Sequence, residues 1–389
     1  MTYKNNTFLS MTILFIFLGL ILVIPPNHAY SQALKDIYAT GSVRFKEEMV
    51  IDESALPEGR FFEGISDLAL DHNGNLYLCD MRACNIKKFS SEGKFLKIIG
   101  KKGQGPGEFN MPSRMAVSGN RLFVFDVDSR RLCCLTTEGE HIKCIIIQYT
   151  EGLPRHIQAL PNGDILIMRE VNYFQEKDKP QDIIIHIYSP ELEQKKTLFK
   201  YPVLRNIYRN IDGMFTNIIQ PFSPYVYMST APNGRVIIGL SKDYTIQVHN
   251  PEKGLIFSFE HPYDPVKVTP QDKETFFSGI TFSIDQTRSE LPEKIKKLTQ
   301  FPRHKPAFDS LLVDDEGNIL IHPIQKNSKD SPLQFDAFTP QGQFIGTMEM
   351  KGIEHFPRTF LMDKGFAWII EWDPEGMPRV VKYKMAAGE

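Results

Sequence analysis

A cassette of four short β-rich runs, separated by turn residues, recurs along this chain and constrains its fold more than any other feature. In the first copy the runs span residues 65–71, 76–80, 86–89 and 94–99. Gly74 lies in the first turn, where a tight hairpin needs a residue that tolerates positive φ. Runs of this length, rich in branched and aromatic residues and bounded by turn residues, predict antiparallel strands.

The first turn of the cassette returns five more times, each time with a glycine before an apolar run. The turn glycines are Gly74, Gly119, Gly163, Gly234, Gly317 and Gly365, spaced by 45, 44, 71, 83 and 48 residues. The three shorter intervals match one β-propeller blade of about 40–50 residues, whereas the two longer intervals need insertions. The chain is therefore predicted to be all-β, a six-bladed β-propeller of four-stranded blades.

The insertions and the closure of the ring can also be placed. The extra residues are 201–220 between blades 3 and 4, and 263–303 between blades 4 and 5. In the second insertion Pro270 begins a short helix and 293–299 form another, because proline is favoured at the first helical position. The last cassette lacks one strand, and 43–51 alternates as a strand that would complete it and remove an exposed edge.

These features give a complete division of the mature chain. We expect a signal peptide at 1–33 and one propeller at 34–389. The blades are expected at about 62–102, 112–150, 153–203, 222–262, 304–351 and 356–386, with the strand 43–51 added to the last.

The N-terminal segment has the organisation of a secretory signal peptide. Lys4 precedes an apolar run at 8–24, and Ser31 and Ala33 suit cleavage after Ala33. An uncleaved anchor is the alternative, because the apolar run is close to spanning length. Otherwise the sequence has no apolar segment long enough to cross a membrane, so we expect an exported protein of the periplasm or cell surface.

The charge balance argues against nucleic acid as a partner. The chain has 45 Lys and Arg and 47 Asp and Glu, a formal net charge of −2. Removing 1–33 takes away one Lys and no acid, which leaves −3. A domain that binds nucleic acid is usually basic.

All five cysteines fall between positions 79 and 144. Cys79 and Cys84 flank one predicted hairpin turn, and Cys133 and Cys144 flank another. In an exported protein either pair could form a cross-strand disulfide, and buried free thiols are the alternative. The odd count leaves at least one cysteine unpaired.

One inter-blade segment carries a family hallmark. Residues 100–109, followed by Pro112 and the apolar run 115–117, resemble the G-x-G-P-G-x-F run of NHL repeats. The layout of 42–386 is similar to NHL-like and TolB-like six-bladed propellers exported by Bacteroidetes-type bacteria. The resemblance implies the fold, whereas function must come from the site, since propellers host many activities.

A basic sequence motif recurs where innermost strands are expected to begin, at the mouth of the central channel. Proline followed by Arg or His stands at 112–114, 154–156, 302–304 and 357–358. We predict a collar that binds an anionic group through arginine, unless these side chains pair with acids or lie on the rim. The collar residues are Arg114, Arg155, His156, Arg303, His304 and Arg358.

The predicted function is a monomeric, non-enzymatic binding or scaffolding propeller. Its partner would be a protein or a small anionic ligand engaged at the channel mouth, with no cofactor. The alternative is a lactonase-like hydrolase or lyase with Ca²⁺ or Zn²⁺ on the axis. Its metal ligands could include Asp67, Asp309, His156 and His304. The sequence has no nucleophile elbow, P-loop or H-E-x-x-H motif.

Overall fold

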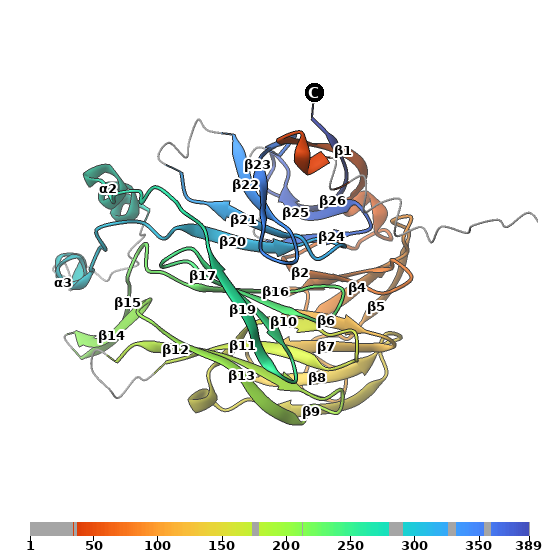
Figure 1. Ribbon diagram of the computed structural model, residues 1–389. Coiled ribbons are helices and arrows are strands. Elements are labelled where there is room, and N and C mark those ends of the chain that lie inside the picture. Colours follow the sequence, from red (N-terminus) through yellow and green to blue (C-terminus); the bar gives the residue numbers. More distant parts are fainter. Residues whose placement is uncertain are drawn as a thin grey trace, which may run out of the picture.

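The computed structural model describes residues 34, 37–172, 179–211, 213–279, 291–325, 332–353 and 359–388 (Figure 1). The predicted signal peptide, 1–33, and the collar residue Arg358 lie outside these ranges. Across the ranges given, no helix is both long and apolar enough to cross a membrane.

Within the described residues, four sheets have four strands each, antiparallel and in chain order. The first contains β2 (Ile65–Leu70), β3 (Leu76–Asp80), β4 (Asn85–Phe89) and β5 (Phe95–Ile99). The second contains β6 (Pro112–Ser118), β7 (Arg121–Asp126), β8 (Arg131–Thr136) and β9 (His141–Ile146). The third contains β10 (Leu153–Ala159), β11 (Ile165–Val171), β12 (Gln181–Tyr188) and β13 (Gln194–Val203). The fourth contains β16 (Val226–Thr230), β17 (Val236–Leu240), β18 (Thr245–Asn250) and β19 (Gly254–Glu260).

A larger sheet joins the two ends of the chain. Its first half contains β20 (Phe308–Val313), β21 (Ile319–Pro323), β22 (Leu333–Phe338) and β23 (Phe344–Lys351). Its second half contains β24 (Phe360–Asp363), β25 (Phe366–Trp372), β26 (Pro378–Ala387) and the N-terminal β1 (Ser42–Ile51). The predicted pairing of the N-terminal strand is confirmed, because β1 runs antiparallel to β26. A short parallel pairing of β1 with β23 joins the two halves.

The innermost strands surround a common axis. Successive contacts link β2, β6, β10, β16, β20 and β24 around the molecule (Figure 1). A cavity of about 370 Å³ lies at the C-terminal ends of these strands, and each of them contributes to its lining. The lining residues include Leu70, Val117, Ala159, Thr230, Val313 and Met362. This arrangement is that of a propeller.

The second strand of each sheet is buried on both faces, because each sheet packs between two neighbours. Residues 76–79 of β3 and 122–125 of β7 are fully buried. Tyr77 and Cys79 share one apolar cluster with Leu122 and Val124 of the next sheet. These two stretches are continuous apolar runs without polar alternation, as expected for strands covered on both faces.

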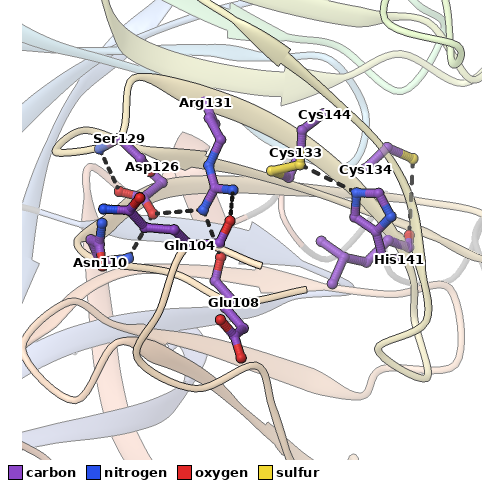
Figure 2. Close-up of a disulfide and its surroundings, with 11 residues drawn as sticks. Gln104, Glu108, Asn110, Asp126, Ser129, Arg131, Cys133, Cys134, His141 and Cys144 are labelled. Carbon is purple, nitrogen blue, oxygen red and sulfur yellow. Dashed lines mark hydrogen bonds and ion pairs between the residues drawn. A yellow bond between two sulfur atoms is a disulfide. The ribbon is translucent and has the colours of Figure 1, made fainter. Parts of the chain in front are cut away.

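Aspartates close the ends of β3 and β7. Asp80 accepts hydrogen bonds from the backbone N–H groups of Glu63 and Gly64, and from Lys87 Nζ at 2.7 Å. Asp126 accepts equivalent backbone hydrogen bonds from Asn110, shown in Figure 2, and from Met111. These side chains satisfy buried donors and fix the connection that enters each blade.

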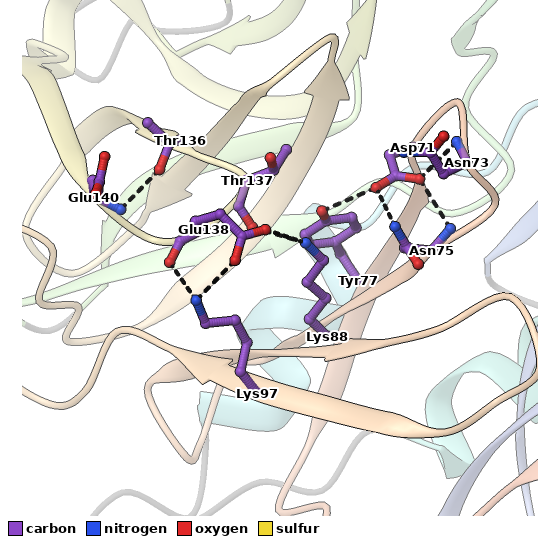
Figure 3. A network of polar contacts seen from close by, with 10 residues as sticks. All are labelled: Asp71, Asn73, Asn75, Tyr77, Lys88, Lys97, Thr136, Thr137, Glu138 and Glu140. Carbon is purple, nitrogen blue, oxygen red and sulfur yellow. Dashed lines mark hydrogen bonds and ion pairs between the residues drawn. The ribbon is translucent and has the colours of Figure 1, made fainter.

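Neighbouring sheets are also tied by polar contacts at their outer parts. Lys88 of β4 lies 2.7 Å from a Glu138 carboxylate oxygen, and Lys97 of β5 lies 3.0 Å from the other (Figure 3). Glu138 belongs to the β8–β9 turn of the next sheet. These pairs hold the outer strands of one blade to the following one.

The two insertions pack against each other. After β13 the chain forms a hairpin of β14 (Asn206–Ile211) and β15 (Met214–Ile219). After β19 come α2 (Pro270–Ser278), capped by Thr269, and α3 (Leu291–Leu298). Ile207, Ile211 and Ile218 of the hairpin pack on Ile295 of α3, on the left in Figure 1.

The cysteines divide between bonded and free. Cys133 and Cys144 are directly opposite in β8 and β9 and form a disulfide (Figure 2). Cys79 and Cys84 are buried free thiols, so the disulfide considered for that pair is absent. The reason is register, since Cys79 faces Ile86 across the hairpin while the Cys84 thiol donates to the Asn110 carbonyl.

Candidate functional site

The start of the innermost strands is marked by a repeated irregularity. In β2, β6 and β20 the pairing with the second strand shifts by one residue after the first pair, and in β10 it shifts after the second pair. The residues at these shifts are Ser66, Ser113, Arg155 and Asp309. A bulge re-aims the side chain of its extra residue and is frequent beside functional sites. Arg155 and Asp309 thus occupy equivalent positions two sheets apart.

Two arginines meet one buried carboxylate at this end. Arg155 Nε lies 3.2 Å and Arg205 Nη1 lies 3.8 Å from Glu170 Oε2. The Arg side chains are 45% and 48% exposed, whereas the Glu170 side chain is fully buried. Asn206 donates to Glu170 Oε1 at 3.0 Å, and Oε2 accepts no hydrogen bond from the described residues. The group carries one net positive charge, and both arginine side chains are about half-exposed.

A row of aromatic rings extends from this group. The Arg205 guanidinium lies over the Tyr225 ring at 4.5 Å from its centroid. The rings of Tyr225 and Tyr227 are 5.6 Å apart, as are those of Tyr227 and Phe308. Burial raises the pKa of Tyr225, Glu170 raises it further, and the nearby arginines Arg205 and Arg155 oppose the rise.

The predicted collar residue Arg114 is anchored to backbone carbonyls. Its Nε donates to the Arg155 carbonyl at 2.9 Å, and its Nη1 donates to the Ser113 carbonyl at 2.7 Å. Two titratable residues near Arg114 have shifted pKa values. Burial raises the pKa of Asp67 to about 6 against the opposing charge of Arg114. Burial, reinforced by Arg114, lowers the pKa of His156 to about 4.

Arg303 and His304 lie before an innermost strand and not within it. The innermost strand β20 begins only at Phe308. The segment that leaves the insertion pairs instead with the segment that enters it. His304 forms an isolated bridge with Lys267, and the Arg303 carbonyl accepts from the Val268 N–H. Arg114 thus contacts Arg155 and lies close to His156, whereas the place of Arg303 and His304 in the collar stays a prediction.

The sequence interpretation missed three residues of the site: Glu170, Arg205 and Tyr227. Glu170 had a usable signal, because it stands near the end of the apolar β11, where a buried charge requires a partner. Arg205 lies in a segment that the repeat spacing identified only as an insertion. Their convergence depends on tertiary contacts between sheets that spacing does not encode.

The same end of the channel holds a carboxylate–imidazole pair. His322 Nδ1 of β21 lies 2.5 Å from Asp309 Oδ1 of β20. The Asp309 side chain is 48% exposed, and that of His322 is mostly buried. Over the described ranges, no group of three or more His, Cys, Asp and Glu residues is placed to hold a metal ion.

Comparison with known proteins identifies the same architecture. Residues 61–147 match the model of the DUF5128 family, described as a 6-bladed beta-propeller. NHL repeat-containing protein 3 of Mus musculus and that of Homo sapiens are 27% and 26% identical to this chain over 116 residues. The matches cover 28% of this chain and 33% of each relative, so the chain spans a third of the length of these curated relatives.

Two solved structures from Bacteroides share the fold over most of the chain. A DUF4221 family member from Bacteroides vulgatus has a TM-score of 0.54 at 14% identity, over 90% of this chain and all of that one. A Bacteroides fragilis protein described as exported has a TM-score of 0.50 at 9% identity, over 90% and 95%. The predicted resemblance to NHL-like propellers is confirmed.

Proposed function

We propose that this chain is an exported six-bladed propeller that binds an anionic ligand at the mouth of its channel without catalysing a reaction. The mouth is the end where the innermost strands begin, beside Arg155 and Arg205. The mature domain would follow a signal peptide at 1–33 and act as a monomer in the periplasm or at the cell surface. Its blades would span about the ranges expected from the repeat.

The observation that carries the proposal is the pairing of two half-exposed arginine side chains with one buried carboxylate. Glu170 aligns Arg155 and Arg205 and neutralises one of their two charges. The remaining N–H donors of a guanidinium form a fork that matches carboxylate and phosphate oxygens. An anion can bind there by displacing water, without breaking the contacts that hold the arginines.

A thermal-denaturation screen with small carboxylates and phosphates tests this proposal. A ligand that binds only the folded state raises the melting temperature. We expect a stabilising anion whose effect is lost in the double variant Arg155→Ala, Arg205→Ala. Lys200→Ala is the matched control, since Lys200 pairs with Asp182 and lies on the outer strand β13.

Two results would contradict the proposal. A stabilising anion that acts unchanged on the double variant would place its site elsewhere. Stoichiometric Ca²⁺ or Zn²⁺ in the purified protein, with a large fall in melting temperature on chelation, would favour the metal-dependent hydrolase or lyase instead.

A further inference from the structure

The channel mouth carries opposite charges at equivalent positions. Arg155 and Asp309 are the residues at the pairing shift of β10 and β20, so both lie at the entrance end of an innermost strand. β16 lies between these strands, because it contacts both of them. One side of the mouth therefore presents Arg155 with Arg205, and the other presents the half-exposed Asp309 carboxylate.

Tyr227 of β16 connects the two sides. Burial is the main cause of its raised pKa, Asp309 raises it further, and Arg205 opposes the rise, so both charges act on this one phenol. The ring of Tyr227 lies between those of Tyr225 and Phe308, which precedes Asp309. The partly exposed rings of Tyr225 and Tyr227 form an aromatic floor between the cationic and the anionic side, and the fully buried ring of Phe308 packs against Tyr227.

The carboxylate on the far side is held in place. His322 Nδ1 contacts Asp309 Oδ1 at 2.5 Å, which fixes the orientation of the carboxylate. Nearly half of the Asp309 side chain remains accessible to a ligand. An ammonium group is a suitable partner, because charge-assisted hydrogen bonds are the strongest that such a carboxylate can make.

From this arrangement we propose that the ligand is a linear zwitterion, a short peptide with free ends. Its carboxylate would bind Arg155 and Arg205, its ammonium group would bind Asp309, and its chain would cross Tyr225 and Tyr227. This inference rests on the proposed anion site and goes beyond it by naming the ligand class.

The separation of the charges sets the length of the peptide. The steps from Arg205 to Tyr225 and from Tyr225 to Tyr227 are 4.5 and 5.6 Å between successive centres. An extended chain advances about 3.5 Å per residue, so a peptide of about three residues spans the floor. A single amino acid would reach only one side.

Calorimetric titration with three related probes tests the inference: trialanine, N-acetyl-trialanine and trialanine amide. We expect trialanine to bind and the loss of either terminal charge to weaken binding about tenfold or more, as removal of a charge-assisted hydrogen bond does. Asp309→Asn should make trialanine bind no better than its acetylated form. Arg205→Ala should abolish the advantage of trialanine over its amide.

Matched controls and outcomes separate this inference from the proposed function. Glu375→Gln removes one exposed negative charge far along the chain, in the turn between β25 and β26, and should leave all affinities unchanged. Equal binding of acetylated and free trialanine, both lost in Arg205→Ala, would overturn the zwitterion and keep the anion site. No binding of these peptides or of any anion would overturn both.

Discussion

Replacing Asp80 with Ala should strongly destabilise the fold, and the cost can be worked from its contacts. Its carboxylate accepts from the N–H groups of Glu63, Gly64 and Ala83 at 3.0, 2.9 and 3.2 Å, and from Lys87 Nζ at 2.7 Å. The side chains of Asp80 and Lys87 are 0% and 2% exposed. Removing one partner of a buried ion pair costs about 3–5 kcal/mol, because the other charge stays buried without compensation.

Urea denaturation of Asp80→Ala measures this cost as a change in unfolding free energy. Lys97→Ala is the comparison, since its ion pair with Glu138 is exposed and should contribute less than about 1 kcal/mol. Adding Lys87→Met to Asp80→Ala should recover part of the loss by removing the stranded ammonium. A loss below about 1 kcal/mol for Asp80→Ala would refute the reasoning.

Three further predictions concern titration and the disulfide. In the folded state His156 has a pKa of about 4, below the ordinary 6.5. The free energy of unfolding should therefore fall as the pH drops from 6.5 to 4, because the unfolded state binds the proton more readily. In urea denaturation, His156→Gln should show a smaller fall. In the folded state Asp67 has a pKa of about 6, above the ordinary 3.8. The free energy of unfolding should therefore fall as the pH rises from 3.8 to 6, because the unfolded state loses the proton more readily. An Asp67→Asn variant with the same pH profile would contradict this. Cys133 and Cys144 are 11 positions apart, and replacing both by Ser should lower the free energy of unfolding by about 3 kcal/mol. An unchanged melting temperature would argue against the disulfide.

Much of the fold follows from the sequence because each blade is specified locally. The turn around Gly74 and the apolar run after it predict β3 with its observed bounds, and the same turn recurs in later sheets. The hairpin of β14 and β15 was not predicted, since the repeat spacing shows only that extra residues are present. Likewise the start of the fifth cassette was placed at 304, whereas β20 begins at Phe308. The reason is that His304, where the chain leaves the insertion, pairs with Lys267, where the chain enters it.

The site is less accessible to sequence reasoning because it depends on which blades adjoin. Arg155 was identified from the basic motif at the start of an innermost strand. The same motif at Arg303 lies on the segment that leaves the insertion, before β20 begins. Glu170 and Arg205 come from a second strand and an inter-blade connection, so neither follows the motif. Their convergence is set by the packing of neighbouring sheets around the axis.

A crystal structure of the protein with the most stabilising anion from the screen tests the central claim most directly. The account predicts ligand density within hydrogen-bond distance of the Arg155 and Arg205 guanidiniums, at the end where the innermost strands begin. Density instead in the 370 Å³ cavity at the opposite end, beside Asp71 and Asp315, would contradict it.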